Sequence, residues 1–72
     1  MKNTTTKKIL NHLTNYGVIS ETEAIIRYMI KPSKLSTSVN ELRSYGFTIS
    51  KTDHSIDNEY DLLNIPDKNW LI

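Results

Sequence analysis

The sequence lacks cysteine entirely and has only two glycines, two prolines, one phenylalanine and one tryptophan among its 72 residues. Without cysteine, a disulfide framework, thiol catalysis and cysteine-ligated zinc are excluded. No apolar run reaches the roughly 18 residues that a membrane span requires, and the opening stretch MKNTTTKK lacks the apolar segment of a signal peptide. We therefore expect a cytoplasmic protein that has no membrane partner.

The length of the chain sets an upper limit on its core. A chain of 72 residues buries about 60% of its unfolded surface, which is enough for one shallow core and too little for a large internal cavity. No internal repeat and no linker divides the sequence. We predict a single domain over residues 1–72, with residues 1–4 disordered, residues 65–72 forming a C-terminal tail, and no small-molecule substrate.

Catalytic and metal-binding patterns are weak. Asp53, His54 and Ser55 are the residue types of a hydrolase triad, but adjacent side chains diverge and cannot form the relay. Acidic residues at alternate positions from Asp53 are typical of a calcium loop, yet its twelfth position is Asn64 instead of glutamate. We predict no enzyme, no metal site and no cofactor, and we expect His12 to lie at the surface or at its boundary.

Charge is distributed unevenly along the chain, although the net charge is only +1. Residues 1–50 hold seven Lys or Arg and three Glu, a balance of +4. Residues 51–72 hold two Lys and five acids, a balance of −3. The first part suits an anionic partner, whereas the second suits a protein partner or simply solubility.

Apolar spacing predicts two helices in the first part of the chain. The first begins near Thr5 or Thr6, either of which can cap it, and ends at Gly17. Its buried face is predicted to hold Ile9, Leu10, Leu13 and Tyr16. After a short apolar link at residues 18–19, which could form a minor strand, Ser20 and Glu23 make a capping box for a second helix over residues 21–29. We expect Ala24, Ile25 and Tyr28 to face inward and Ile26 outward.

A third helix is predicted over residues 34–45, with Pro32 before it and Ser33 as its cap. Leu35, Val39 and Leu42 recur at helical spacing and form its buried stripe. Gly46 ends the helix. Alternating apolar and polar residues at 47–50 and 59–62 then predict a two-stranded antiparallel hairpin.

The order of these elements, together with two stretches of sequence, carries a resemblance to a known family. The stretches KILNHLTNYGVISETEAIIRYMI and LSTSVNELRSYGFTI resemble the small phage-type winged helix-turn-helix DNA-binding proteins, over about 42 of the 72 residues. The resemblance implies an α+β, mostly α fold with three helices and a two- or three-stranded antiparallel wing. The chain departs from the family in having Met29 where a small residue is usual, a longer connection over residues 31–34, and an acidic wing, KTDHSIDNEYD.

In such a domain the third helix enters the major groove of double-stranded DNA and the wing reaches neighbouring backbone. With the apolar stripe inward, Glu41 also points outward, and the residues expected to contact bases are Ser36, Thr37, Asn40 and Ser44. Asparagine can pair with adenine, and threonine can contact the thymine methyl group. The residues expected to contact phosphates are Lys7, Lys8, Lys31, Lys34, Arg43 and Lys51. A regulator from a phage or other mobile element, acting as a homodimer in the host cytoplasm, is the expected function.

Three alternatives stay open, one of which is an excisionase-like or antirepressor-like accessory factor that bends DNA or recruits another protein. The polar face of the third helix could be merely solvated, with Arg43 paired to a carboxylate of the acidic segment. The domain could also be a protein-binding module or inhibitor that contacts a host or phage protein, in part as a DNA mimic. The candidate protein interface consists of Ile26, Asp53, Asp57, Glu59, Trp70 and Ile72.

Overall fold

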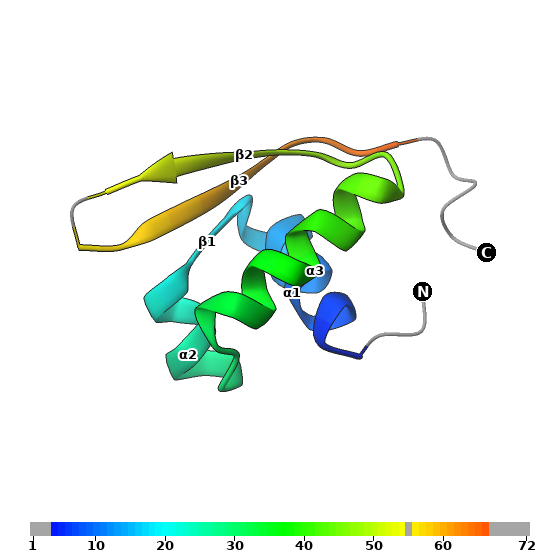
Figure 1. Cartoon of the computed structure of the whole chain (residues 1–72). Helices are drawn as coiled ribbons and strands as arrows, with labels where there is room; N and C mark the ends of the chain where they lie inside the picture. Colours follow the sequence, from blue (N-terminus) through cyan, green and yellow to red (C-terminus); the bar gives the residue numbers. More distant parts are fainter. Residues whose placement is uncertain (1–3, 55, 67–72) are drawn as a thin grey trace.

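The computed structural model describes residues 4–54 and 56–66. Within these ranges three helices pack against a three-stranded antiparallel sheet (Figure 1). The elements are α1 (Thr4–Tyr16), β1 (Val18–Ser20), α2 (Glu21–Tyr28), α3 (Pro32–Ser44), β2 (Thr48–Asp53) and β3 (Asn58–Asn64). The predicted fold class, three helices with a small antiparallel sheet, is therefore confirmed.

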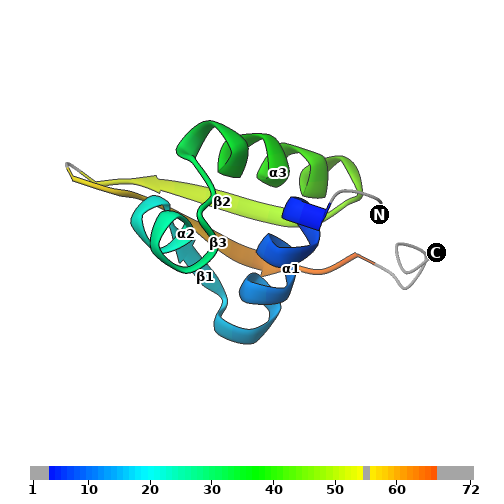
Figure 2. The ribbon, with the colours of Figure 1, turned by 90° about the horizontal axis from the view of Figure 1, so that it is seen from below.

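The sheet joins the β2–β3 hairpin, which is the wing, to the helical part of the molecule. β3 lies in the centre, between β1 and β2. Ile19 of β1 is paired with Tyr60 of β3, and both side chains are buried in the core. The β2–β3 hairpin is longer than predicted and extends beyond the helices, and α2 lies at the end to which the hairpin tip points (Figures 1 and 2).

Helix α1 contributes the predicted apolar residues Ile9, Leu10 and Leu13 to the core. Three expectations for this helix are wrong. Tyr16 is 62% exposed, because it falls in the last turn, whereas His12, one turn earlier, is buried at 1% exposure. The helix begins at Thr4, so Thr6 lies inside it, where its buried hydroxyl donates a hydrogen bond to the Glu41 carboxylate instead of capping the helix.

His12 is buried because its polar atoms have partners on α2. Its Nδ1 lies 2.7 Å from the Tyr28 hydroxyl, and its Nε2 lies 3.2 Å from a Glu23 carboxylate oxygen. The neutral tautomer with hydrogen on Nε2 satisfies both contacts, since Nε2 then donates to Glu23 while Nδ1 accepts from Tyr28. These contacts fasten α1 to α2 through the interior.

Helix α2 begins with the serine half of the predicted capping box, since the Ser20 hydroxyl accepts a hydrogen bond from the Glu23 amide at 3.0 Å. The Glu23 carboxylate instead contacts His12 and Arg27.

Ala24 is fully buried and Tyr28 packs against the core, as predicted. The prediction that Ile25 faces inward is wrong, since its side chain is 47% exposed. The short helix packs against the core through the side that holds Ala24 and Tyr28. Ile26 is exposed, as expected.

The turn between α2 and α3 depends on an unusual backbone conformation at Met29. This residue has φ 57° and ψ 37°, the left-handed region in which glycine is most common. The next residue, Ile30, then turns into the core. Helix α3 starts at Pro32, with Lys31 in the cap position. Ser33 is therefore not the cap, and the connection is three residues long, shorter than predicted.

Helix α3 packs through Leu35, Val39 and Leu42, all fully buried, as predicted. Ser38 lies on the same inward side and is also buried. The helix stops before Gly46, which has φ 104°. This φ favours glycine, because residues with a Cβ rarely adopt it. The space around Gly46 also favours glycine, since a Cβ at this position would lie 3.0 Å from the Cβ of Pro66.

Candidate nucleic-acid interface

The side of α3 opposite its buried stripe is exposed and made of small polar side chains. Helix α3 crosses the middle of the molecule in Figure 1. All four residues predicted to contact bases lie on its exposed side: Ser36, Thr37, Asn40 and Ser44. Small side chains let a helix approach the floor of a groove closely, so this surface has the shape that a recognition helix requires.

Two hydroxyl groups on this surface are already engaged with the helix backbone. The Thr37 hydroxyl donates to the Ser33 carbonyl at 2.9 Å, and the Ser44 hydroxyl donates to the Glu41 carbonyl at 2.5 Å. Each oxygen can still accept a hydrogen bond. Thr37 therefore presents a methyl group and an acceptor to a ligand, while its own proton is committed to the helix.

Asn40 is held by the neighbouring Arg43. The Arg43 Nη1 lies 3.3 Å from the Asn40 side-chain oxygen. The Nε and Nη2 atoms of the same guanidinium donate to the Ile49 carbonyl of β2, at 3.1 and 2.8 Å. Among the described residues, these polar contacts of Arg43 involve no carboxylate, so the alternative pairing with the acidic segment is not seen. Arg43 instead connects the exposed polar side of α3 to β2 of the hairpin.

Glu41 does not project outward as predicted. It is only partly exposed, and its carboxylate accepts a hydrogen bond from the buried hydroxyl of Thr6 on α1. Because the two residues are 35 positions apart, no local sequence pattern indicates this contact. Glu41 therefore links α3 to α1.

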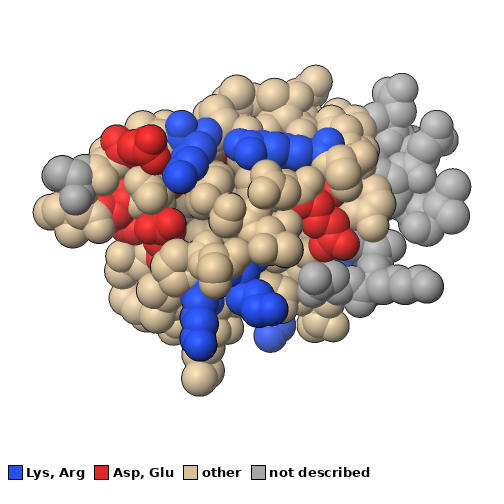
Figure 3. Space-filling model, viewed as in Figure 1, with Lys and Arg blue, Asp and Glu red and all other residues tan. Residues whose placement is uncertain are grey.

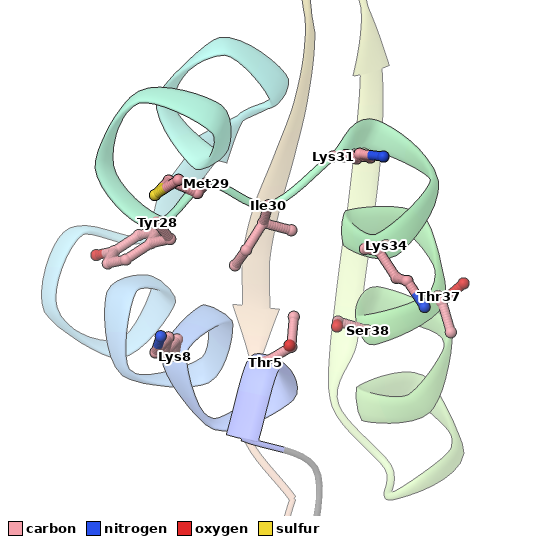
Figure 4. A pocket seen from close by; sticks show the side chains of 9 residues that line it. All are labelled: Thr5, Lys8, Tyr28, Met29, Ile30, Lys31, Lys34, Thr37 and Ser38. Carbon is pink, nitrogen blue, oxygen red and sulfur yellow. The ribbon is translucent and has the colours of Figure 1, made fainter.

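A hollow of about 420 Å³ adjoins the N-terminal half of α3 (Figure 4). Three predicted phosphate contacts line it: Lys8 from α1, Lys31 from the turn and Lys34 from α3. Hydroxyl groups of Thr37 and the buried Ser38 also lie in its wall. The sequence did not single out Ser38, although its position next to the apolar stripe places it on the inner side.

The remaining predicted phosphate contacts lie outside this hollow. Lys7 is exposed on α1 and is not among the residues that line it. Lys51 lies on β2, where its amino group is 3.6 Å from the Asp53 carboxylate. Figure 3 shows basic atoms in two groups on this face, one by the hairpin and one below the first half of α3. Acidic atoms form one group towards the hairpin tip and a smaller one on the opposite side of the same face.

The acidic residues of the hairpin have contacts within the chain. An Asp57 carboxylate oxygen accepts from the Thr22 amide at 3.1 Å, which caps α2 from a distant segment. Glu59 lies 2.6 Å from His54. Asp53, paired with Lys51, is still 77% exposed. Of the other predicted protein-interface residues, Ile26 is exposed, and Trp70 and Ile72 lie outside the described residues.

The Asp57 contacts alter its acidity. Desolvation raises the pKa of this carboxyl group, but hydrogen bonds from Thr22, Ser20 and the Asn58 backbone outweigh that effect, so the pKa lies below its ordinary value. The negative charge also lies at the positive end of the α2 dipole, where it is favourable. Asp57 therefore has a structural role as a charged helix cap.

Two kinds of feature are absent from the described part of the chain. No described helix is long and apolar enough to cross a membrane. No group of three or more His, Cys, Asp or Glu among the described residues is arranged to hold a metal ion.

Comparisons with known proteins identify the family. Neither the curated proteins nor the solved structures that were compared with the chain gave a match. A family model described as winged helix-turn-helix domain matches residues 4–60, which include all three helices and most of the hairpin. Such domains generally bind DNA and are typically not enzymes. Since the match covers most of the 72 residues, the chain belongs to the winged helix-turn-helix domain family.

Proposed function

We propose that the protein binds double-stranded DNA with sequence selectivity, as a small regulator, and that α3 enters the major groove. The observation that carries this proposal is the juxtaposition on α3 of an exposed small polar face with a lysine-lined hollow. The first supplies groups that distinguish base edges, and the second supplies cations for phosphates. The phage or mobile-element origin expected from the sequence stays a prediction.

Asn40 is the main candidate for reading a base. An asparagine can accept from N6 and donate to N7 of adenine at once. The contact with Arg43 uses one side of the Asn40 oxygen, which leaves a second lone pair and the amide hydrogens for a base. Thr37, one turn earlier, is placed to contact a thymine methyl group. Arg43 acts as a positioning residue, since its contacts with Ile49 fix the side chain that orients Asn40.

Phosphate binding is assigned to the lysines around the hollow. Lys8, Lys31 and Lys34 come from three different segments, so phosphate contacts at all three would fix the orientation of the whole domain on the duplex. Lys7 and Lys51 would add weaker contacts on either side. Because Lys51 is paired with Asp53, its contribution is the smallest of the five.

The internal pairing of the hairpin acids bears on the rival function, an acidic module that mimics DNA. Asp57 caps α2 and Glu59 pairs with His54, so only part of the negative charge of the hairpin is directed to solvent. A DNA mimic presents its acids to a partner, whereas Asp57 and Glu59 are engaged with groups of this chain. The protein-binding alternative therefore rests on Asp53 as its most exposed acid.

Selection from a pool of random-sequence duplexes tests the proposal. The purified chain is expected to enrich one family of related sites over several rounds. A non-selective binder would retain duplexes without enrichment, and a protein-binding module would retain none even at low salt. Either result would contradict sequence-selective binding.

Two matched variants show whether α3 is responsible for the selection. Asn15→Ala removes an exposed asparagine from α1, whereas Asn40→Ala removes one from α3. Only the second is expected to change the enriched sequence, and loss of preference should be confined to one position. The same selected motif with both variants would contradict the placement of α3 in the major groove.

A further inference from the structure

A second surface lies between α2 and the tip of the hairpin and is not used by the proposed function. It is a groove of about 500 Å³ with two isoleucines in its walls. Ile26 of α2 is 74% exposed and Ile56 at the hairpin tip is 95% exposed. Scattered single apolar residues on a surface are ordinary, but two that line one groove form a local apolar site.

The charges around this groove are arranged in a self-complementary way. Arg27, on the α2 wall, contacts Glu23 through Nε at 3.2 Å, and a guanidinium has two further amino groups for other partners. Asp57, on the hairpin wall, caps α2 through one oxygen and carries a negative charge. A twofold axis through the groove brings Arg27 of one copy towards Asp57 of the other, twice.

The location of the groove also suits a symmetric pair. α2 and the hairpin tip share one end of the molecule, beside the exposed face of α3 and not on it (Figures 1 and 2). Two copies that meet at this end can therefore keep both α3 helices exposed on the same side. The longest extent of the molecule is 36 Å. Since α3 crosses the middle, the two helices would be separated by a distance similar to the roughly 34–36 Å between half-sites of a dimeric DNA-binding protein.

We infer that this groove is the contact between two copies of the chain. A stable dimer usually buries about 800 Å² on each partner. The accessible surface of this chain is 4847 Å², so such an interface would cover a large share of it. Because only two isoleucines form the apolar centre, the dimer is weak and dissociates at roughly micromolar to millimolar concentrations. The inference goes beyond the proposed function, and its test requires no DNA, so either can fail without the other.

Sedimentation equilibrium of the full chain, without DNA, tests the inference directly. The mass is expected to rise from that of a monomer towards that of a dimer as the concentration rises from about 10 μM to 1 mM. Ile26→Ser and Ile56→Ser should each weaken self-association by at least about tenfold. The matched control is Leu63→Ser, which removes an apolar residue that is 64% exposed on β3, away from the groove, and should have no effect.

Three outcomes would overturn the inference. The chain would stay monomeric up to 1 mM, or the dimer would form equally well with both isoleucine substitutions, or Leu63→Ser would weaken it as much as they do. Circular dichroism of each variant establishes that its fold is intact, which is expected because all three side chains are exposed. Arg27→Glu probes the charge arrangement: a weaker dimer supports the pairing with Asp57, and an unchanged association constant contradicts it.

Discussion

The guanidinium of Arg43 is bound to the carbonyl of Ile49 through two nitrogen atoms, at 3.1 and 2.8 Å. This relationship fastens the last turns of α3 to the first half of β2. It also leaves Nη1 directed at Asn40, 3.3 Å away. Recognition helix, wing and candidate base-reading side chain are thus joined by a single residue.

Replacement of Arg43 by lysine should separate its positioning role from its charge. Lysine keeps the positive charge but lacks the planar fork that contacts the Ile49 carbonyl and Asn40 together. We expect Arg43→Lys to lose preference at the position read by Asn40, while the dependence of affinity on salt is unchanged. The measurement is the binding constant for the selected site and for single-base variants of it.

A double-mutant cycle gives the corresponding control. If Arg43 acts through Asn40, then Arg43→Lys should add nothing to the loss of preference caused by Asn40→Ala. Additive losses would show that Arg43 contacts DNA independently, as the sequence had predicted.

His12 should be important for stability although it does not line the hollow assigned to phosphate binding. His12→Phe leaves the Tyr28 hydroxyl and the Glu23 carboxylate without their buried partner, so we expect a loss of about 2–3 kcal/mol in the free energy of unfolding. His54→Phe is the matched control, since His54 is half exposed and pairs with Glu59 at the surface. His54→Phe should lower the free energy of unfolding by less than about 1 kcal/mol. Urea unfolding measures both, and equal losses would contradict the role assigned to His12.

Met29 offers a substitution that should stabilise the protein. Its left-handed backbone costs a residue with a Cβ about 1–2 kcal/mol, which glycine avoids. The greater freedom of glycine in the unfolded chain offsets part of this gain. We expect Met29→Gly to raise the free energy of unfolding by about 0.5–1 kcal/mol, and Met29→Ala to give no gain. The side chain is 89% exposed, so lost packing should be small. A less stable glycine variant would show that Met29 makes a stabilising contact.

Asp57 should make stability dependent on acid. Its pKa is lowered in the folded protein, so its contribution to stability is fully present above the unfolded value, near pH 4, and is lost as the pH falls through the folded value. Asp57→Asn should therefore lower the melting temperature at pH 7, and the difference from the parent should shrink below about pH 4. Thermal unfolding over pH 2–7 measures this. A difference that does not change with pH would show that the charge on Asp57 is not what stabilises α2.

Much of the fold could be predicted from the sequence because its signals are local. The stop at Gly46 and the buried stripe of Leu35, Val39 and Leu42 depend on residues within a few positions of one another. The wrong expectations concern contacts between distant segments. No nearby residue indicates that His12 is satisfied by α2, or that Glu41 turns to bond Thr6, 35 positions earlier.

In the candidate site, too, features set by local sequence could be predicted, whereas contacts between distant segments could not. The exposed polar face of α3 followed from helical periodicity, because the buried stripe fixes which residues point outward. The hollow could not be predicted from helical periodicity, because it forms where α1, the turn and α3 come together in space. Likewise the commitment of Arg43 to the Ile49 carbonyl depends on the path of the chain after Gly46.

The most direct test of the account is the salt dependence of binding to the selected duplex, compared with Lys34→Ala. If Lys7, Lys8, Lys31, Lys34 and Lys51 contact phosphates, the logarithm of the binding constant should fall with the logarithm of salt concentration with a slope of about −4.5. Lys34→Ala should weaken binding to every sequence alike and reduce the slope by about one unit. Binding that does not change with salt, or an unchanged slope for Lys34→Ala, would contradict the account.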